Sequence, residues 1–294
     1  MSSALNIIKI ILLSIIAVAL VGLLIVALNG KIKINGIDLV EKTELVYENT
    51  FSEPVENLNI VTTNNDVKIE EKETEGIEVK IYDRKDAKPT AEVKDNTLYI
   101  DNIDEVRIGF SFGINGNSRI EITVPKGTTY NLKVEGTSSD VDSLINLKEV
   151  NIDTKSGDIN LKDSINTIIN TTSGDILVGD TNKLEITTTS GDIKTGNVKE
   201  SIYAKATSGD FLLGDINGKL TLNTTSGDIK INSVNLTKDS SIKVISGDVV
   251  ISKTNDIYID AHATSGDIKV NTNNRKSDYE LKINTTSGDI IVNN

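Results

Sequence analysis

The tripeptide Ser-Gly-Asp recurs through the second half of the chain and constrains its fold more than any other feature. The copies begin at Ser156, Ser173, Ser190, Ser208, Ser226, Ser246, Ser265 and Ser287. Consecutive copies are 17 to 22 residues apart. Apolar residues usually fall six and four positions before each Ser, and three and five positions after it. This alternation on both sides predicts that every unit is a strand, a corner and a second strand.

One such unit has too few apolar residues to bury a core alone, whereas copies stacked about 4.8 Å apart share a continuous core. Degenerate copies occur at Ser138-Ser139-Asp140 and, earlier, at Asn64-Asn65-Asp66. We therefore predict an all-β fold, a parallel β-solenoid (β-helix) of about nine rungs. The unit around Ser246 has its apolar pair at Ile242 and Val244, which predicts a shortened and distorted incoming strand.

The tripeptide has the chemistry of a tight corner. Gly adopts positive φ without a steric cost, while Ser and Asp side chains can bond neighbouring backbone groups. The predicted structural corners are Gly157, Gly174, Gly191, Gly209, Gly227, Gly247, Gly266 and Gly288.

If the rungs stack in register, the Asp of each corner joins a column of carboxylates. Its members are Asp158, Asp175, Asp192, Asp210, Asp228, Asp248, Asp267 and Asp289. Neighbouring charges about 4.8 Å apart repel by about 0.9 kcal/mol in water, so the column needs compensation. Backbone N–H groups could supply it, helped by Lys194, Lys230 and Lys269, which lie two positions beyond their Asp. Bound Ca²⁺ between rungs is the alternative, and it is the one cofactor that the sequence suggests. The structural explanation is favoured, since each rung supplies a single carboxylate.

Threonines directly before the corner form a second expected column, which should face outward. Its members are Thr172, Thr189, Thr207, Thr225, Thr264 and Thr286. A flat Thr ladder could bind glycan or mineral surfaces, or it could simply reflect the preference of Thr for strands.

Residues 10–28 form an uncharged, almost wholly apolar stretch of 19 residues. As a helix it would span roughly 28 Å, which matches a bilayer core, so we predict one transmembrane α-helix before the solenoid. A buried core helix and a cleaved signal peptide are the alternatives. Lys9 on one side faces Lys31 and Lys33 on the other, which leaves the orientation nearly undecided. An early apolar segment followed by a long polar domain favours an extracytoplasmic repeat domain.

The predicted organisation has five parts. They are a tail (1–9), the transmembrane helix (10–28), a linker (29–54), an N-terminal β region with hairpins that cap the solenoid (55–130) and the repeat solenoid (131–294).

Charge and composition exclude several functions. The chain carries 43 acidic and 31 basic residues, a net charge of −12, which argues against nucleic acid and anionic lipid as partners. His262 is the only histidine and there is no Cys, which excludes thiolate sites and paired-His metal sites, and nothing in the sequence points to a Ser-His-Asp triad around that one His. We predict that the chain is not an enzyme.

The serial Thr-Thr-Ser-Gly-Asp-Ile units at 171–176, 224–229 and 285–290 resemble a bacterial putative-adhesin domain family of β-strand repeats, as does the Val124-Pro125-Lys126-Gly127 segment. The resemblance covers roughly residues 55–294. It implies a bacterial, membrane-attached, adhesin-like protein with the repeats outside the cytoplasm, and it supplies no functional residues.

Two functional hypotheses follow. The first is a non-enzymatic, single-pass protein of the cell membrane that presents a rigid solenoid to a surface, a glycan or a protein partner. The alternative is an envelope scaffold that self-assembles end to end through an uncapped rung after Val292.

Overall fold

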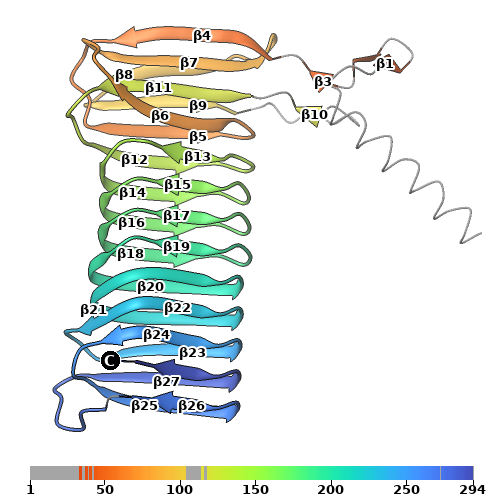
Figure 1. Ribbon diagram of the computed structural model, residues 1–294. Coiled ribbons are helices and arrows are strands. Elements are labelled where there is room, and N and C mark those ends of the chain that lie inside the picture. The colour runs from red at the N-terminus through yellow and green to blue at the C-terminus, as the bar shows by residue number, and fades with distance from the viewer. Residues whose placement is uncertain are drawn as a thin grey trace, which may run out of the picture.

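The chain folds into a rod of stacked coils (Figure 1). The computed structural model describes residues 43–103, 118–271 and 273–293. It also describes the backbone of four short strands, β1 (Lys33–Ile34), β2 (Ile37–Asp38), β3 (Val40–Glu41) and β10 (Ile114–Asn115). The remaining described strands form one 24-stranded sheet that winds around a single core.

Each coil contributes one strand to each of two faces, which we call face A and face B. Face A is a parallel stack of β9 (Thr97–Asn102), β5 (Asn57–Thr62), β12 (Tyr130–Glu135), β14 (Leu147–Asp153), β16 (Ser164–Asn170), β18 (Thr181–Thr187), β20 (Val198–Ser208), the second half of β21 (Phe211–Ser226), β23 (Ser240–Ser246), β27 (Glu280–Ser287) and β25 (Tyr258–Ser265).

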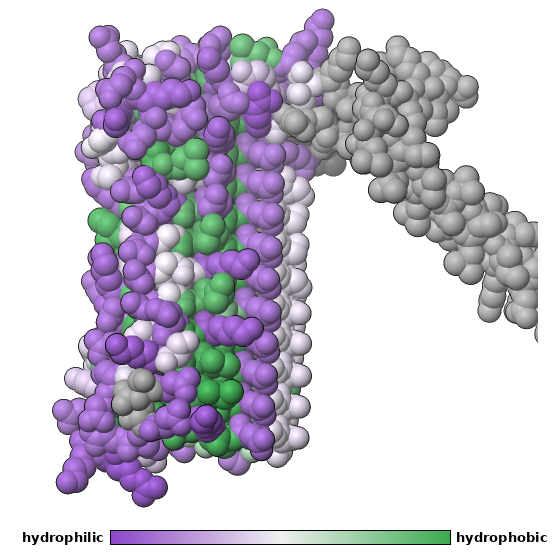
Figure 2. Space-filling model, viewed as in Figure 1, coloured by the Kyte–Doolittle hydropathy of each residue, from purple (hydrophilic) through white to green (hydrophobic). Residues whose placement is uncertain are grey.

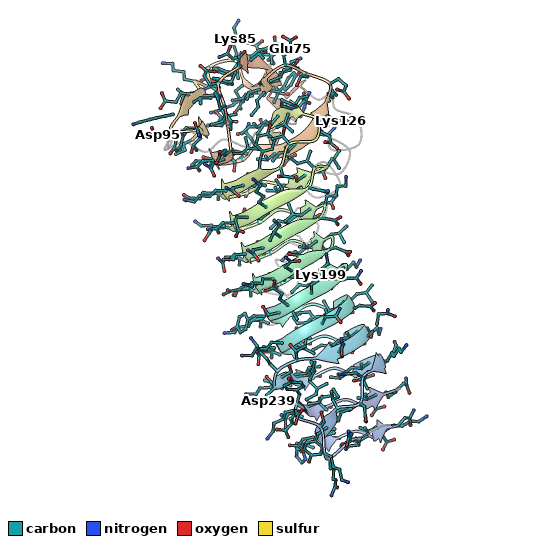
Figure 3. All side chains as sticks on the ribbon, turned by 90° about the vertical axis from the view of Figure 1, so that its left-hand side faces the viewer. Glu75, Lys85, Asp95, Lys126, Lys199 and Asp239 are labelled. Carbon is teal, nitrogen blue, oxygen red and sulfur yellow. The ribbon has the colours of Figure 1, made fainter. Side chains whose placement is uncertain are left out.

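Face B is a second parallel stack that follows the corners. It contains β11 (Arg119–Pro125), β6 (Asp66–Lys72), β13 (Val141–Ser143), β15 (Ile159–Leu161), β17 (Ile176–Val178), β19 (Ile193–Thr195), the first half of β21, β22 (Ile229–Leu236), β24 (Val249–Thr254), β28 (Ile290–Val292) and β26 (Ile268–Val270). Asp95, in the turn just before β9, and Lys126, just after β11, lie on opposite sides of the rod in Figure 3.

Antiparallel strands close the N-terminal end of the rod. On face B, β7 (Ile77–Arg84) pairs antiparallel with β11, and β4 (Thr43–Phe51) pairs antiparallel with β7. On face A, β8 (Thr90–Lys94) and β9 form a hairpin whose turn residues Asp95 and Asn96 have positive φ. Residues 43–51, assigned above to the linker, therefore belong to this cap.

The predicted fold class is consequently wrong in describing a parallel solenoid. The sheet is mixed, because the β8–β9 hairpin and the antiparallel pairs of β7 with β11 and β4 satisfy the edges of the first coils. The predicted transmembrane helix at 10–28 lies outside the described residues. Those that are described form strands, turns and loops, and none of their segments is a helix able to span a membrane. Over the residues that the structure describes, the fold class is all-β with a mixed sheet.

The register between coils is the one that the repeats predict. Leu58 of the early copy pairs with Leu132, and Val67 pairs with Val141, so the early copy is a rung of the same stack. Around Ser246 the expected distortion is absent: Ile242 pairs with Leu222, and Ser246 pairs with Ser226. Ser240 simply occupies a buried position that is aliphatic in most rungs.

The last two rungs do not follow sequence order. β27 and β28 lie between the rung of β23 and β24 and the rung of β25 and β26 (Figure 1). The C-terminal rung is therefore internal, and β25 with β26 forms the end of the rod. The terminal rung carries Ala261 and Ala263 where the internal rung has Ile283 and Thr285, so this order exposes less apolar surface at the open end.

A matched pair of variants tests the inverted order. Ile290 and Ile268 are register partners, yet Ile290 is fully buried and Ile268 is 45% exposed. We expect Ile290→Ala to lower the free energy of unfolding by about 3 kcal/mol and Ile268→Ala by less than about 1 kcal/mol. Urea denaturation of both variants measures the difference. Rungs stacked in sequence order would give the opposite ranking.

Candidate functional site

The corners bring neighbouring rungs unusually close together. Every corner Gly that the sequence singles out has φ between 120° and 147°. A Cβ added to Gly191 would lie 2.0 Å from the carbonyl oxygen of Gly174, and the other corners are similar. Gly is thus required twice, for its backbone conformation and for the approach of the next rung.

The Asp residues of the corners form one continuous column that is held by hydrogen bonds. The N–H of Asp210 donates to Oδ1 of Asp192 at 2.9 Å, and the N–H of Asp192 donates to Oδ1 of Asp175 at 2.9 Å. The same bond joins all successive members, from Asp66 and Asp140 through Asp158, Asp228, Asp248 and Asp289 to Asp267. Backbone donors therefore compensate the stacked carboxylates, as the structural explanation requires.

The donor set of this column does not fit Ca²⁺. The ion takes six to eight oxygen ligands, whereas each rung offers one carboxylate with one oxygen already bonded. Among the residues that the structure describes, no three His, Cys, Asp or Glu side chains gather as a metal site. The calcium hypothesis stays a prediction that the geometry does not favour.

Electrostatics at the column are visible at two of its members. Desolvation, together with the charge of Asp140, raises the pKa of Asp66 despite the hydrogen bond from the Asp140 backbone. Lower in the rod, Nζ of Lys230 lies 3.8 Å from Oδ2 of Asp228, as the position of that Lys two residues beyond its Asp suggests.

A second ladder at the opposite end of the face B strands was missed by the sequence reasoning. Oδ1 of Asp163 accepts the N–H of Asp180, Oδ1 of Asp180 accepts that of Asn197, and Oδ1 of Asn197 accepts that of Asp215, at 2.8 to 3.0 Å. The available signal was an Asp or Asn seven residues after each of the first four repeat Ser residues, preceded by Gly in three of these four cases.

Two columns of threonines flank the corner on face A. The outward column predicted above is exposed at all its positions. A buried column one residue earlier, which the sequence analysis did not identify, donates to the carbonyl of the repeat Ser, as in Thr171 to Ser173 at 3.1 Å and Thr188 to Ser190 at 3.1 Å. Figure 2 shows the corner columns as unbroken vertical rows along the right-hand edge of the rod.

A buried polar network, also missed, ties the cap to the first rung. Oδ2 of Asp83 accepts from the amides of Asn65 (3.0 Å) and Asn102 (2.7 Å), and Oδ1 accepts from the hydroxyl of Ser118 (3.3 Å). All four residues are at most 8% exposed. Asn65 occupies the position of the corner Gly in later rungs. In this early copy, the close contact between corner backbones is therefore replaced by a hydrogen bond from the Asn65 side chain to Asp83 of the cap.

The outer surface of face A is hollowed along its upper half. Three adjoining hollows, of about 690, 440 and 420 Å³, run along the rod. The first two share Lys133 and Asn151, and the last two share Glu149, Asn166 and Ile168. We call this continuous depression, which runs from β9 and β5 to the second half of β21, the trough.

Three large side chains stand exposed in the trough. Tyr99, Ile168 and Tyr203 are 40 to 42% exposed. Strand registers place them in one outward column, with Asn59, Lys133 and Asn151 between Tyr99 and Ile168, and Glu185 between Ile168 and Tyr203. His262 is remote from this column, on the exposed terminal strand β25.

Comparison with known proteins agrees with this architecture. A family model described as Toastrack DUF4097 matches residues 55–293. The chain is similar to the crystal structure of a putative adhesin from Parabacteroides distasonis, with a TM-score of 0.52 and 14% identity over 86% of this chain and 99% of the other. A putative adhesin from Bacteroides fragilis matches with a TM-score of 0.40 and 15% identity over 84% of this chain and 97% of the other. Comparison with curated proteins found no match. The resemblance to an adhesin-domain family is confirmed.

Because the backbones of neighbouring corners lie so close together, adding one methyl group at a corner Gly should greatly lower the stability of the fold. Gly191→Ala places a Cβ against a backbone oxygen and should cost more than about 3 kcal/mol of unfolding free energy. Gly127 is the matched control, because it also has positive φ but has no atom within 4 Å of an added Cβ. We expect Gly127→Ala to cost about 1 kcal/mol. Equal costs in chemical denaturation would contradict the role of rung contact.

The raised pKa of Asp66 predicts that the Asp66→Asn variant is more stable than the native chain, by an amount that depends on pH. Because the folded pKa exceeds the ordinary value of 3.8, the native carboxyl lowers stability as pH rises through the window above 3.8, and the loss is complete at neutral pH. Asp66→Asn keeps an oxygen that can accept the Asp140 N–H and lacks this loss. We expect it to melt higher than the native chain at pH 7 and to lose the advantage below 3.8.

The Ala variant at the same position separates charge from hydrogen bonding. Asp66→Ala removes the acceptor and should be about 1 kcal/mol less stable than Asp66→Asn at every pH. Thermal melts of the three proteins across this pH range provide the measurement. An Asn variant whose advantage grows on acidification would contradict the assigned direction of the pKa shift.

Proposed function

The chain belongs to the Toastrack DUF4097 family, and we propose that it is a non-enzymatic cell-envelope protein whose rigid β rod binds a surface or a partner molecule. The observation that carries this proposal is the continuity of the stack. Both faces are unbroken ladders from the cap to the terminal rung, so the outward side chains form fixed arrays along the whole rod. Such an array suits binding to an extended or repetitive target.

The distribution of acidic groups supports a binding role over catalysis. The corner carboxylates are spaced evenly along the rod and are engaged by backbone donors, so they differ from the paired acid and base that a hydrolase needs. The neighbouring structures described as putative adhesins support the same reading at the level of fold.

We further propose that the protein resides at the cell membrane with the rod outside the cytoplasm. The uncharged apolar stretch at 10–28 supports this location. The chain has no Cys, so outside the cytoplasm the rod would be held together by its ladder hydrogen bonds and stacked core without disulfides.

A bead assay tests the binding function. Beads coated with the purified full-length chain are washed over purified bacterial cell walls and over mucin, with heat-unfolded chain on matched beads as the control. We expect retention of the folded chain on at least one of these surfaces and no release of soluble sugars from it. Equal retention of folded and unfolded chain would overturn the proposal, and sugar release would overturn its non-enzymatic part.

A second candidate function is end-to-end assembly, which the open edge of β25 favours. The uncapped rung expected after Val292 is internal, so the open end is instead the rung of β25 and β26. Asn273 covers its start by bonding both the N–H and the carbonyl of Ile259, at 3.1 and 2.9 Å. The edge beyond Ile259 could pair with a second copy.

Sedimentation of the full-length chain over a range of concentrations tests assembly. We expect a concentration-dependent larger species that Ala263→Pro abolishes, because Pro at an edge position removes a ladder donor and blocks a further strand. A monomer at all concentrations would exclude this candidate without affecting the binding function.

A further inference from the structure

We propose that the trough on face A binds an uncharged linear polysaccharide that lies parallel to the rod. This inference deepens the proposed binding function, on which it rests, by naming the site and the ligand class. It depends on the exposed column of Tyr99, Ile168 and Tyr203, on the amides around it, and on the charge balance of the lining.

The two tyrosines provide separated stacking platforms. From the strand spacing, Tyr99 lies about 19 Å from Ile168, and Ile168 lies about 10 Å from Tyr203. A pyranose ring presents polarised C–H groups that pack well on the electron-rich face of a phenol ring. A protein partner would instead be expected to need one contiguous apolar centre, and these three side chains do not form one.

Ordered amides supply the polar contacts. The Asn131 amide donates to Oδ1 of Asn57 at 2.8 Å, and the Asn166 amide donates to Oε1 of Glu149 at 2.7 Å. These bonds fix each side chain along the axis and leave it hydrogen-bonding capacity for ligand hydroxyls. Asn59, in the same lining, adds a third amide to this group.

The charges lining the trough are nearly balanced, which favours an uncharged ligand: the bases are Lys133, Lys183 and Lys219, and the acids are Glu135, Glu149, Asp153 and Glu185. Nζ of Lys133 lies 2.6 Å from Oε1 of Glu135, and Nζ of Lys183 lies 3.5 Å from Oε2 of Glu200. An anionic polymer would meet Glu149 and Glu185 as well as these engaged lysines, and the net charge of the chain is −12.

The backbone excludes an added peptide strand at this site. Each strand of face A between β9 and the second half of β21 is paired on both sides, so its N–H and carbonyl groups are used within the ladder. Recognition must come from side chains, and a trough about 29 Å long between its two tyrosines suits a polymer better than a single sugar.

Calorimetry of the full-length chain with cellohexaose, maltohexaose and chitohexaose tests the assignment. We expect at least one of these neutral hexasaccharides to bind with an affinity that added salt leaves unchanged. Tyr99→Ala and Tyr203→Ala should each weaken binding about 5- to 10-fold. Leu212→Ala, which removes a side chain 52% exposed on face B, is the matched control and should bind like the native chain.

The outcomes separate this inference from the binding function on which it rests. Binding that both tyrosine variants weaken and the Leu212 variant retains supports the trough. Absence of binding to all three sugars, or binding that the tyrosine variants leave intact, overturns the inference. If coated beads are still retained on cell walls or mucin in that case, the binding function stands and its site lies elsewhere on the rod.

Discussion

The approach of one corner to the next is the constraint on which the rest of the structure depends. At Gly191 the space for a Cβ is already occupied by the carbonyl oxygen of the rung above, and the adjacent Asp192 carboxylate accepts the backbone N–H of the rung below. Together these contacts fix the distance and the register between coils. Once that register is fixed, every aliphatic position falls above its equivalent, and the continuous core follows.

A stack of this kind must also end, and its two ends are managed differently. At the N-terminal end, antiparallel strand pairs and the buried network around Asp83 join the first rungs to the cap. At the other end the chain places its rung with the smaller residues, Ala261 and Ala263, outermost, and Asn273 imitates part of a further strand. Part of the backbone of the edge strand β25 is thereby hydrogen-bonded, and the rest stays open for pairing.

The repeats predict most of the rod, because one local pattern dictates each unit. Corners, register and the early copy at Asn64 follow from the spacing of Gly, Asp and aliphatic residues. The hairpin cap was predicted from strand-like runs outside the repeats, but the pairing of β4 with β7 was not, because β4 lies in the segment assigned to the linker. The inverted order of the last rungs was not predicted either, because it depends on which rung loses least by being exposed. Ser240 is a further position that the apolar pattern predicts wrongly, because a polar residue there suggests a missing strand position. In the structure Ser240 keeps its place in the strand, since its hydroxyl accepts the Leu220 N–H and donates to the carbonyl of Lys238. The trough is invisible in the repeat pattern because its residues belong to the variable, outward positions.

That separation between fixed and variable positions explains how a rod of this kind can acquire a binding site. Inward columns and corners are constrained by stacking, whereas outward columns such as the one containing Tyr99, Ile168 and Tyr203 touch only their neighbours above and below. Substitution there would alter the outer surface of the rod at little cost to its stability. Because outward side chains recur at the spacing of the rungs, an array built from them matches ligands that are themselves linear and repetitive.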